Sequence, residues 1–543
     1  TSYTYDQNDN VLTTTEGTNT ITRDYDDVNR VTTLTAQGSS GQSTIGYTHD
    51  KVGNLTTLTY PGGKQVFYEY DKANRLTTVT AWGGKITKYE YNKNGWLTKT
   101  TRPDLTVETR TYYDNGSLKE LKDVDRDGKI ILQHSYTYNK AGEITQEQNA
   151  SEAAFALKDA AMTYTTDNRI ATFNGKSVTY DADGNMTHGP LSGDMSSFTY
   201  DSKNRLTSAG NTTYTYDAEG NRTAVTENGN TTRYAINPNA PLSQVLIKTD
   251  SQGNQTYYIY GLGLIAQEEA GVYKTYHFDK RGSTVALTDI NGAITDTFQY
   301  SVYGELVKRN GTTSTPFLFN GMFGVMTDSN GLYYMRARYY NPEIKRFINQ
   351  DVLLGSIANG QSLNRYAYVN GNPVSYVDPF GLALRAPDYY VFEFSVGPEF
   401  VGVGPNIIVD RYGNVYGGGG VSGGISVPSV FIGVKADARV SVGWLAQDKK
   451  PSPEELRKHL EGFGVTHSAG AGPGASVNWS PDNGTVSVEL GLYTPQVQVG
   501  VDGTWLLIEG DPLAKYGRGH WNSPYVYGID PDYTEDTGKP FGL

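Results

Sequence analysis

The chain has 543 residues, with 62 glycines, 42 tyrosines and 37% apolar residues, a composition that fits a large β protein of more than one domain. It contains no cysteine, which excludes disulfides and thiolate metal sites. The formal net charge of −12 disfavours broad contact with a nucleic-acid backbone, and no apolar run is long enough for a transmembrane helix. Because Thr1 lies in mid-pattern without a leader before it, we expect the chain to be part of a longer protein.

A tyrosine followed by Asp or Asn recurs through the first half of the chain. Fuller copies of the unit read YDKANRLT at 70–77, YDSKNRLT at 200–207 and YDAEGNRT at 216–223. Asp with Asn or Gly favours a tight turn, and the flanking Tyr, Thr and Leu alternate with the period of two that is typical of strands. Copies are expected at these tyrosines: Tyr25, Tyr70, Tyr91, Tyr113, Tyr138, Tyr180, Tyr200 and Tyr216.

Each unit is therefore predicted to be a β-hairpin. A single hairpin cannot bury its apolar face, so a repeat of about 20 residues implies that hairpins stack into one continuous sheet. A long spiralling sheet has to curve, and a curved sheet can enclose a volume. The sequence alone does not establish that the sheet closes around a cavity.

The segment DVDRDG at 123–128 places oxygen ligands at alternating positions before a glycine. This is the first half of a calcium loop, with Asp123, Asp125 and Asp127 as the candidate ligands. His134 stands where such a loop needs a bidentate glutamate. Ordinary turn chemistry explains the segment equally, and we favour that interpretation.

The stretches NPEIKRFINQDVLLG at 341–355 and NRYAYVNGNPVSYVDPFGL at 364–382 form one aperiodic signature. Together with YHFDKRGSTVAL at 276–287, it closely resembles the end of the core in Rhs and YD-repeat proteins, the polymorphic toxins related to the C component of Tc toxin complexes. The resemblance covers about residues 1–382. It implies that the repeats wind into a hollow, cocoon-like shell.

The resemblance also implies a cut after the DPFGL segment by an aspartic-protease-like activity of the core. It puts the scissile bond between Leu382 and Ala383, the two carboxylates at Asp351 and Asp378, and an orienting arginine at Arg346. Two carboxylates held close share one proton, so one acts as base toward water and the other as acid. The alternative is structural: Asp378 before proline starts a turn, and Arg346 pairs with Asp351.

After residue 382 the repeat unit disappears. Residues 383–543 carry 11 Lys and Arg against 18 Asp and Glu, a net charge of −7. Alternating, glycine-rich segments predict a small antiparallel β domain, either a barrel or a sandwich. One helix is expected from Ser452 as its N-cap to about Gly462. The predicted architecture is thus all-β, with a repeat shell at 1–330, a core-terminal segment at 331–382 and a variable domain at 383–543.

The activity of residues 383–543 is open between three interpretations. A soluble β domain is favoured, and membrane insertion is the second possibility because glycine-rich amphipathic strands are flanked by tryptophan. For an enzyme, the candidates are His467 and His520 in glycine-rich loops, with Glu489 as a carboxylate partner.

The function that these features favour is a toxin that encapsulates its C-terminal effector and releases it by self-cleavage, exported from a bacterium and delivered into a target cell. We expect a cognate immunity protein for residues 383–543 and a secretion machinery or shell subunit as partners. No cofactor and no confident metal site are predicted. The rival is a YD-repeat surface or adhesion protein that binds carbohydrate and carries an appended β domain.

Overall fold

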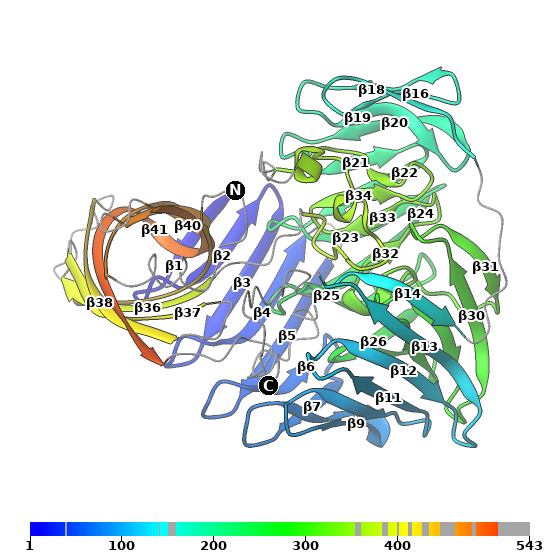
Figure 1. Cartoon of the computed structure of the whole chain (residues 1–543), viewed down its shortest axis with the longest axis horizontal. Coiled ribbons are helices and arrows are strands. Elements are labelled where there is room, and N and C mark those ends of the chain that lie inside the picture. The colour runs from blue at the N-terminus through cyan, green and yellow to red at the C-terminus, as the bar shows by residue number, and fades with distance from the viewer. Residues whose placement is uncertain are drawn as a thin grey trace, which may run out of the picture.

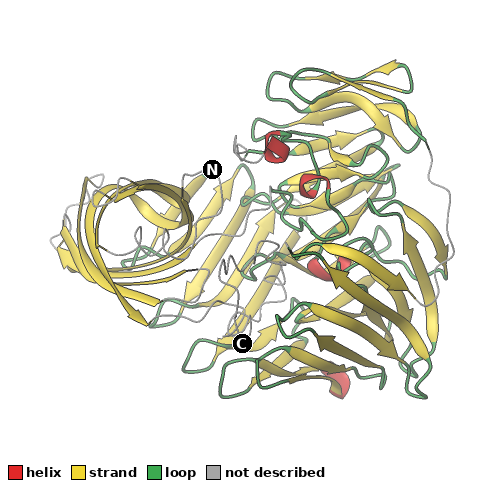
Figure 2. Ribbon diagram, viewed as in Figure 1, coloured by secondary structure: helices red, strands yellow, loops and turns green. Residues whose placement is uncertain are grey.

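The computed structural model describes residues 1–38, 41–140, 142–149, 159–352 and 360–382, together with the strands that follow residue 388. Antiparallel strands joined by short turns dominate it (Figure 2). The helices of the described residues are single 3-10 turns: η1 (Trp82–Gly84), η2 (Gly321–Phe323), η3 (Gly360–Leu363) and η4 (Val369–Gly371). The prediction of an all-β shell of stacked hairpins is confirmed.

Two sheets of 14 strands each form most of the molecule, and in both the strands pair in chain order (Figure 1). The first sheet contains β1 (Ser2–Tyr5), β2 (Val11–Glu16), β3 (Asn19–Tyr25), β4 (Val31–Gly38), β5 (Gly41–His49), β6 (Leu55–Thr59), β7 (Gln65–Tyr70), β8 (Leu76–Ala81), β9 (Lys85–Tyr91), β10 (Leu97–Thr101), β11 (Val107–Tyr112), β12 (Leu118–Val124), β13 (Ile130–Tyr138) and β14 (Ile144–Asn149).

The second sheet contains β18 (Thr179–Tyr180), β19 (Met186–Leu191), β20 (Asp194–Tyr200), β21 (Leu206–Ala209), β22 (Thr212–Tyr216), β23 (Arg222–Glu227), β24 (Asn230–Asn237), β25 (Gln244–Thr249), β26 (Gln255–Gly261), β27 (Gly263–Glu269), β28 (Val272–Phe278), β29 (Thr284–Thr288), β30 (Ile294–Tyr300) and β31 (Leu306–Asn310). Between the two large sheets in the chain lies a three-stranded sheet of β15 (Met162–Tyr164), β16 (Ile170–Phe173) and β17 (Lys176–Ser177).

The turn of each repeat is fixed by its aspartate. Asp71 Oδ1 accepts hydrogen bonds from the amides of Ala73 (2.8 Å) and Arg75 (3.0 Å), and Asp71 Oδ2 accepts one from Arg75 Nε (2.7 Å). Asn74 takes the left-handed conformation that this turn requires, with φ 58°. The pattern D-x-x-N-R therefore encodes a complete turn, because each recurring position of the unit satisfies one backbone or side-chain group.

The tyrosine of each unit ties one hairpin to its predecessor. Tyr91 Oη donates to the carbonyl of Leu76 at 2.6 Å, the Leu of the preceding unit. The same bond joins Tyr25 to Val11, Tyr70 to Leu55, Tyr112 to Leu97 and Tyr138 to Leu118. One predicted copy is shifted: Tyr113 stands in the aspartate position of its turn, since its amide bonds the Ser117 carbonyl, and Tyr112 makes the cross-repeat bond.

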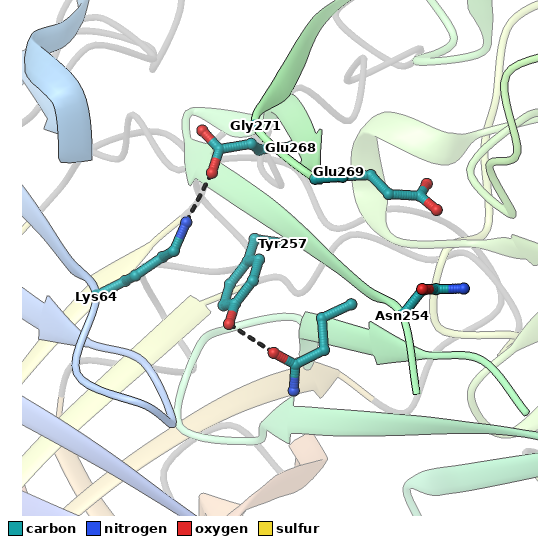
Figure 3. A pocket seen from close by; sticks show the side chains of 8 residues that line it. Lys64, Asn254, Tyr257, Glu268, Glu269 and Gly271 are labelled. Carbon is teal, nitrogen blue, oxygen red and sulfur yellow. Dashed lines mark hydrogen bonds and ion pairs between the residues drawn. The ribbon is translucent and has the colours of Figure 1, made fainter. Parts of the chain in front are cut away.

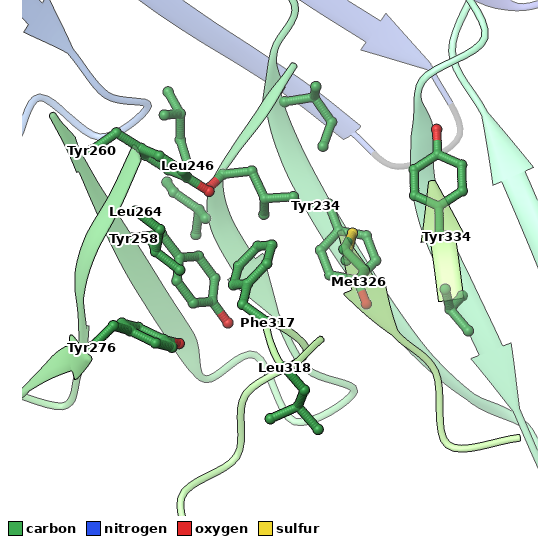
Figure 4. Close-up of a cluster of buried hydrophobic side chains, with 14 of the residues drawn as sticks. Tyr234, Leu246, Tyr258, Tyr260, Leu264, Tyr276, Phe317, Leu318, Met326 and Tyr334 are labelled. Carbon is green, nitrogen blue, oxygen red and sulfur yellow. The ribbon is translucent and has the colours of Figure 1, made fainter. Parts of the chain in front are cut away.

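The two large sheets meet through contacts between residues about 200 positions apart. Tyr60 Oη donates to the Tyr258 carbonyl at 2.7 Å, and Arg205 forms an ion pair with Glu16 at 2.9 Å. One hydrophobic cluster contains buried residues of both sheets. Figure 4 shows part of it, where the ring of Tyr258 packs edge to face against Phe317 from the segment after β31. Buried tyrosines combine a large apolar area with a hydroxyl that finds a carbonyl, which suits a wall of stacked hairpins.

A four-stranded sheet follows the second large sheet: β32 (Met326–Thr327), β33 (Tyr333–Met335), β34 (Arg338–Asn341) and β35 (Arg346–Phe347). Beyond Leu382 come β36 (Tyr389–Pro398), β37 (Val401–Asp410), β38 (Val415–Ile425), β39 (Val434–Leu445), β40 (Gly462–Ser480) and β41 (Thr485–Ile508). These six pair antiparallel in the order β38-β37-β36-β39-β41-β40, and β38 also pairs with β41, which closes a ring of five strands. The helix predicted from Ser452 lies outside the described residues.

Candidate self-cleavage site

The DPFGL segment is held against the β33–β34 hairpin by backbone and side-chain hydrogen bonds. The Ala337 amide donates to the Phe380 carbonyl at 3.1 Å, and Arg336 Nη1 donates to the Pro379 carbonyl at 2.6 Å. Gly381 has φ +67°, and a Cβ there would collide with the Met335 carbonyl oxygen. Only glycine fits this position, so the segment approaches the hairpin as closely as backbone allows.

Arg338, the first residue of β34, lies between the two predicted carboxylates. Its Nη2 is 2.6 Å from Asp351 Oδ2 and 3.5 Å from Asp378 Oδ2. Its Nη1 donates to the Arg365 carbonyl at 2.8 Å, and its Nε donates to the Gly381 carbonyl. Arg338, Asp351 and Asp378 are each no more than 3% exposed, so the three charges lie together away from bulk water.

The carboxylates come from two segments that the backbone positions separately. The Asp351 amide donates to the Arg365 carbonyl at 2.9 Å, and the Arg365 guanidinium donates back to the Asp351 carbonyl. Asp378 Oδ1 accepts the amide of Leu382 at 2.9 Å. That bond puts one carboxyl directly on the residue whose carbonyl belongs to the predicted scissile bond.

The two carboxyls differ in environment. Burial raises the pKa of Asp378 to about 7; the nearby charge of Asp351 adds to this effect, whereas Arg338 and the Leu382 amide oppose it. Asp351 makes the closer ion pair with Arg338. Near neutral pH, Asp378 thus holds a proton, while Asp351 faces the Arg338 cation. A pair in which one carboxyl is protonated and the other is ionised can supply both a general acid and a general base.

The structure brings Asp351, Asp378 and Leu382 together, whereas Ala383 lies outside the described residues. Arg346 points elsewhere: its Nη1 donates to the Asn168 carbonyl and its Nη2 to Asn364 Oδ1, both at 2.7 Å. The predicted ion pair of Arg346 with Asp351 is therefore wrong, and Arg338 occupies that position. Position along the chain favoured Arg346, but the register of the β33–β34 hairpin determines which arginine reaches the carboxylates.

The calcium interpretation of 123–128 is wrong. Asp123 is fully buried, with its carboxylate bound by Arg102 and His277. Asp125 Oδ1 instead accepts the amides of Asp127 and Lys129, both at 2.9 Å, as the turn aspartate does at Asp71. The described residues hold no group of His, Asp and Glu that fits a metal ion.

The effector candidates are placed only by strand register. His467, predicted in a glycine-rich loop, lies instead on β40 opposite Val499, and Glu489 lies on β41 opposite Ser476. His520 lies outside the described residues. Within the described part of the chain, no helix has the length and apolar character needed to cross a membrane.

A pocket of about 290 Å³ lies where turns of the two large sheets meet (Figure 3). Lys64 forms an ion pair with Glu268 at 2.6 Å, and Tyr257 Oη donates to Gln255 Oε1 at 2.7 Å. Lys64 also lies 4.3 Å from the centre of the Tyr257 ring. These internal pairs join the sheets, and we assign the pocket a structural role.

Comparison with known proteins identifies the class of this fold. Residues 106–374 match the teneurin YD-shell family model, and residues 49–86 and 70–107 match the RHS repeat. Stacked hairpins that each carry the tyrosine–aspartate unit place the fold in the class of YD-repeat shells. The chain belongs to the Rhs/YD-repeat family.

Relatives that are named for their activities align with limited parts of the chain. The tRNA3(Ser)-specific nuclease WapA of Bacillus spizizenii is 28% identical over 274 residues, which are 49% of this chain and 11% of the relative. The double-stranded DNA deaminase toxin A of Burkholderia cenocepacia is 31% identical over 164 residues, or 29% of this chain and 11% of the relative. A crystal structure of TcdB2-TccC3 shares the fold, with a TM-score of 0.52 and 17% identity, over 68% of this chain and 24% of that one.

Proposed function

We propose that this chain is part of an Rhs-type toxin, in which a repeat shell at 1–330 and a core-terminal segment at 331–382 release an effector at 383–543. The observation that carries the proposal is the pair of buried carboxylates, Asp351 and Asp378, that share Arg338 beside the Leu382 amide. The matched relatives include a nuclease and a deaminase toxin whose lengths the chain covers only in small part.

The proposed reaction is hydrolysis of the bond between Leu382 and Ala383. Asp351 takes a proton from a water molecule, whose oxygen attacks the Leu382 carbonyl carbon. Asp378, which carries a proton near neutral pH, donates it to the carbonyl oxygen. When the resulting tetrahedral intermediate collapses, Asp351 gives the proton that it took from water to the leaving nitrogen, and Asp378 takes a proton back from one of the two hydroxyls. The carbon–nitrogen bond breaks, leaving a carboxylate on Leu382 and an amine on Ala383. The intramolecular position of the peptide supplies the orientation that a separate substrate would lack.

Intact-mass analysis of the purified chain tests this function. We expect two fragments that meet between Leu382 and Ala383, and one uncut chain for Asp351→Asn and for Asp378→Asn. Asp250→Asn is the matched control, because Asp250 also accepts the amide four residues on, at 2.8 Å, in an exposed turn. Cutting at that bond in both site variants would remove the carboxylates from the mechanism.

Partners and location follow from the same proposal. An effector released inside its own producer requires an immunity protein, and a shell that carries it out of the cell requires a secretion machinery or a further shell subunit. Expressing residues 383–543 in bacteria with and without the neighbouring open reading frame tests both points. Growth arrest that the neighbour relieves supports the toxin, and normal growth in both cases contradicts it.

A further inference from the structure

A second buried polar network joins the two large sheets, formed by residues other than those of the Asp351 and Asp378 site. The first sheet contributes residues of β11, β12 and the turn after β10, and the second contributes β28 and the end of β29. Each member is 5% exposed or less. The members are Arg102, Asp104, Glu108, Asp123, His277 and Thr288.

The hydrogen bonds of this network run in an unbroken chain. His277 Nδ1 lies 2.7 Å from Asp123 Oδ2, and His277 Nε2 lies 2.8 Å from Thr288 Oγ1. Thr288 Oγ1 in turn donates to Asp104 Oδ2 at 2.5 Å. Arg102 completes the first sheet's side, with Nη1 3.0 Å from Asp123 Oδ1. Both contacts that cross between the sheets therefore pass through His277 and Thr288.

The number of protons available to these hydrogen bonds determines the protonation state of His277. A threonine hydroxyl has one proton, and Thr288 gives it to Asp104, so His277 Nε2 has to donate to Thr288. Nδ1 faces a carboxylate, which only accepts. Both ring nitrogens then carry protons, and His277 is an imidazolium.

The extra proton has one other possible location, on Asp104. A proton on the ring places one cation between the carboxylates of Asp123 and Asp104, whereas a proton on Asp104 would not, so the ring is the favoured location. Although burial raises the pKa of Asp123, the charges of Arg102 and His277 hold it at about 2, so this carboxylate stays an acceptor.

The charge balance leads to the same state. Arg110 Nε adds a second arginine, 2.7 Å from Glu108 Oε1. Burial raises the pKa of the neighbouring Tyr89 and Tyr273, which therefore stay neutral. The charged groups of the cluster are the cations Arg102, Arg110 and His277 and the anions Asp104, Glu108 and Asp123. With a neutral ring, one buried negative charge would lack a partner, which is costly in a low-dielectric interior.

We propose that this network is a proton-dependent clasp between the two sheets, closed while His277 is an imidazolium and opened when that proton is lost. After deprotonation, His277 Nε2 faces the Thr288 hydroxyl, which already donates its proton to Asp104. One carboxylate of the network is then left without a cation. The stability that the clasp contributes is present while the ring is charged and is lost as the pH rises through its deprotonation. On the acid side it is lost when Asp123 takes up a proton, which its neighbours Arg102 and His277 displace to a pH below the usual range of an aspartate.

Asp104→Asn gives a sharp test, because the side-chain amide replaces the missing proton. The amide nitrogen introduced by the substitution would donate to Thr288, and Thr288 would then donate to a neutral His277. We expect the variant to keep the clasp at high pH with one ring proton on Nδ1. Wild-type protein should show protons on both ring nitrogens at neutral pH.

Nitrogen NMR of histidine-labelled full chain reads the ring state, with His277→Gln used to assign the signal among the 7 histidines. Hydrogen exchange of the β12 and β28 amides reads opening. In wild type, protection should fall about tenfold per pH unit once the ring loses its proton, beyond the intrinsic rise in exchange. In Asp104→Asn this dependence should vanish.

The matched control is His134→Gln, a second buried histidine, on the neighbouring strand β13, whose ring bonds Glu147 at 2.8 Å instead of a member of the clasp. It should keep the wild-type dependence. A singly protonated His277 in wild type at neutral pH would overturn the proposal, as would unchanged pH dependence in Asp104→Asn or its loss in the control.

Discussion

Replacing Arg338 with methionine should disable the self-cleavage site while keeping most of the side chain's volume. Removing one partner of a buried ion pair costs about 3–5 kcal/mol, because the remaining charge is left without a partner. Here two carboxylates, at 2.6 Å and 3.5 Å from Nη2, lose their common cation. We expect a loss of unfolding free energy in the upper part of that range at pH 8. The loss should be smaller at pH 5, where Asp378 carries a proton instead of a charge. Without the cation to hold Asp351 as a base, cleavage should slow by about a hundredfold or more.

A double-mutant cycle measures the effect separately from general damage. Urea unfolding and time-resolved intact-mass analysis are compared for Arg338→Met, Asp351→Asn and the pair. Because the asparagine removes the stranded charge, the double variant should be more stable than Arg338→Met alone. Arg346→Met is the control, and it should cleave at the wild-type rate because Arg346 bonds Asn168 and Asn364 instead. Normal cleavage in Arg338→Met, or strictly additive stabilities, would refute this account of the site.

Four further outcomes follow from the structure. Burial raises the folded-state pKa of Asp378 to about 7, so the stability that its proton contributes is complete below about pH 4 and is lost as the pH rises through 7. Urea unfolding at a series of pH values should show a change of about 4 kcal/mol in the free energy of unfolding, and Asp378→Asn should remove this change. Cleavage should also fall above pH 7, as intact mass would show, because the acid form disappears. Gly381→Ala should destabilise the shell by at least about 2 kcal/mol and slow cutting, since its Cβ would meet the Met335 carbonyl. Tyr91→Phe should cost about 1 kcal/mol in thermal unfolding through one lost hydrogen bond.

Sequence was sufficient for the repeats because their chemistry is local. The turn at Asp71 satisfies its own groups within five residues, so the pattern alone specifies the hairpin. The copy at Tyr113 shows the limit of this reasoning. Two adjacent tyrosines left the register open by one residue, and only the strand pairing of Tyr112 with Leu118 resolves it. The bonds between the two sheets, such as that of Tyr60 with Tyr258, have no local signal at all.

The sequence was sufficient to predict the two carboxylates of the candidate site, but it did not identify the arginine that pairs with them. Asp351 and Asp378 stand in fixed motifs, whereas three arginines, Arg336, Arg338 and Arg346, lie within a short stretch of alternating strands. Which of them faces the carboxylates depends on the pairing of Tyr334 with Tyr339 and of Asn341 with Arg346. The strand pairing therefore determines which arginine reaches the carboxylates, and the spacing of the arginines along the sequence does not. The same holds for His277, whose partner Asp123 lies 154 positions away.

Every segment that builds the cleavage site is also bonded to the second large sheet or to the turns between its strands. Asn341 Nδ2 donates to the Pro190 carbonyl at 2.8 Å, and the Met186 amide donates to the Ile348 carbonyl at 2.9 Å. Arg336 Nη2, beside the DPFGL segment, donates to the Ser243 carbonyl at 2.9 Å. The first sheet is joined as well, through the Ile144 amide and Ser375 Oγ at 3.0 Å. The segments that carry Arg338, Asp351 and Asp378 are thus anchored to both sheets, and we expect the proposed cut to follow completion of the shell and not to precede it.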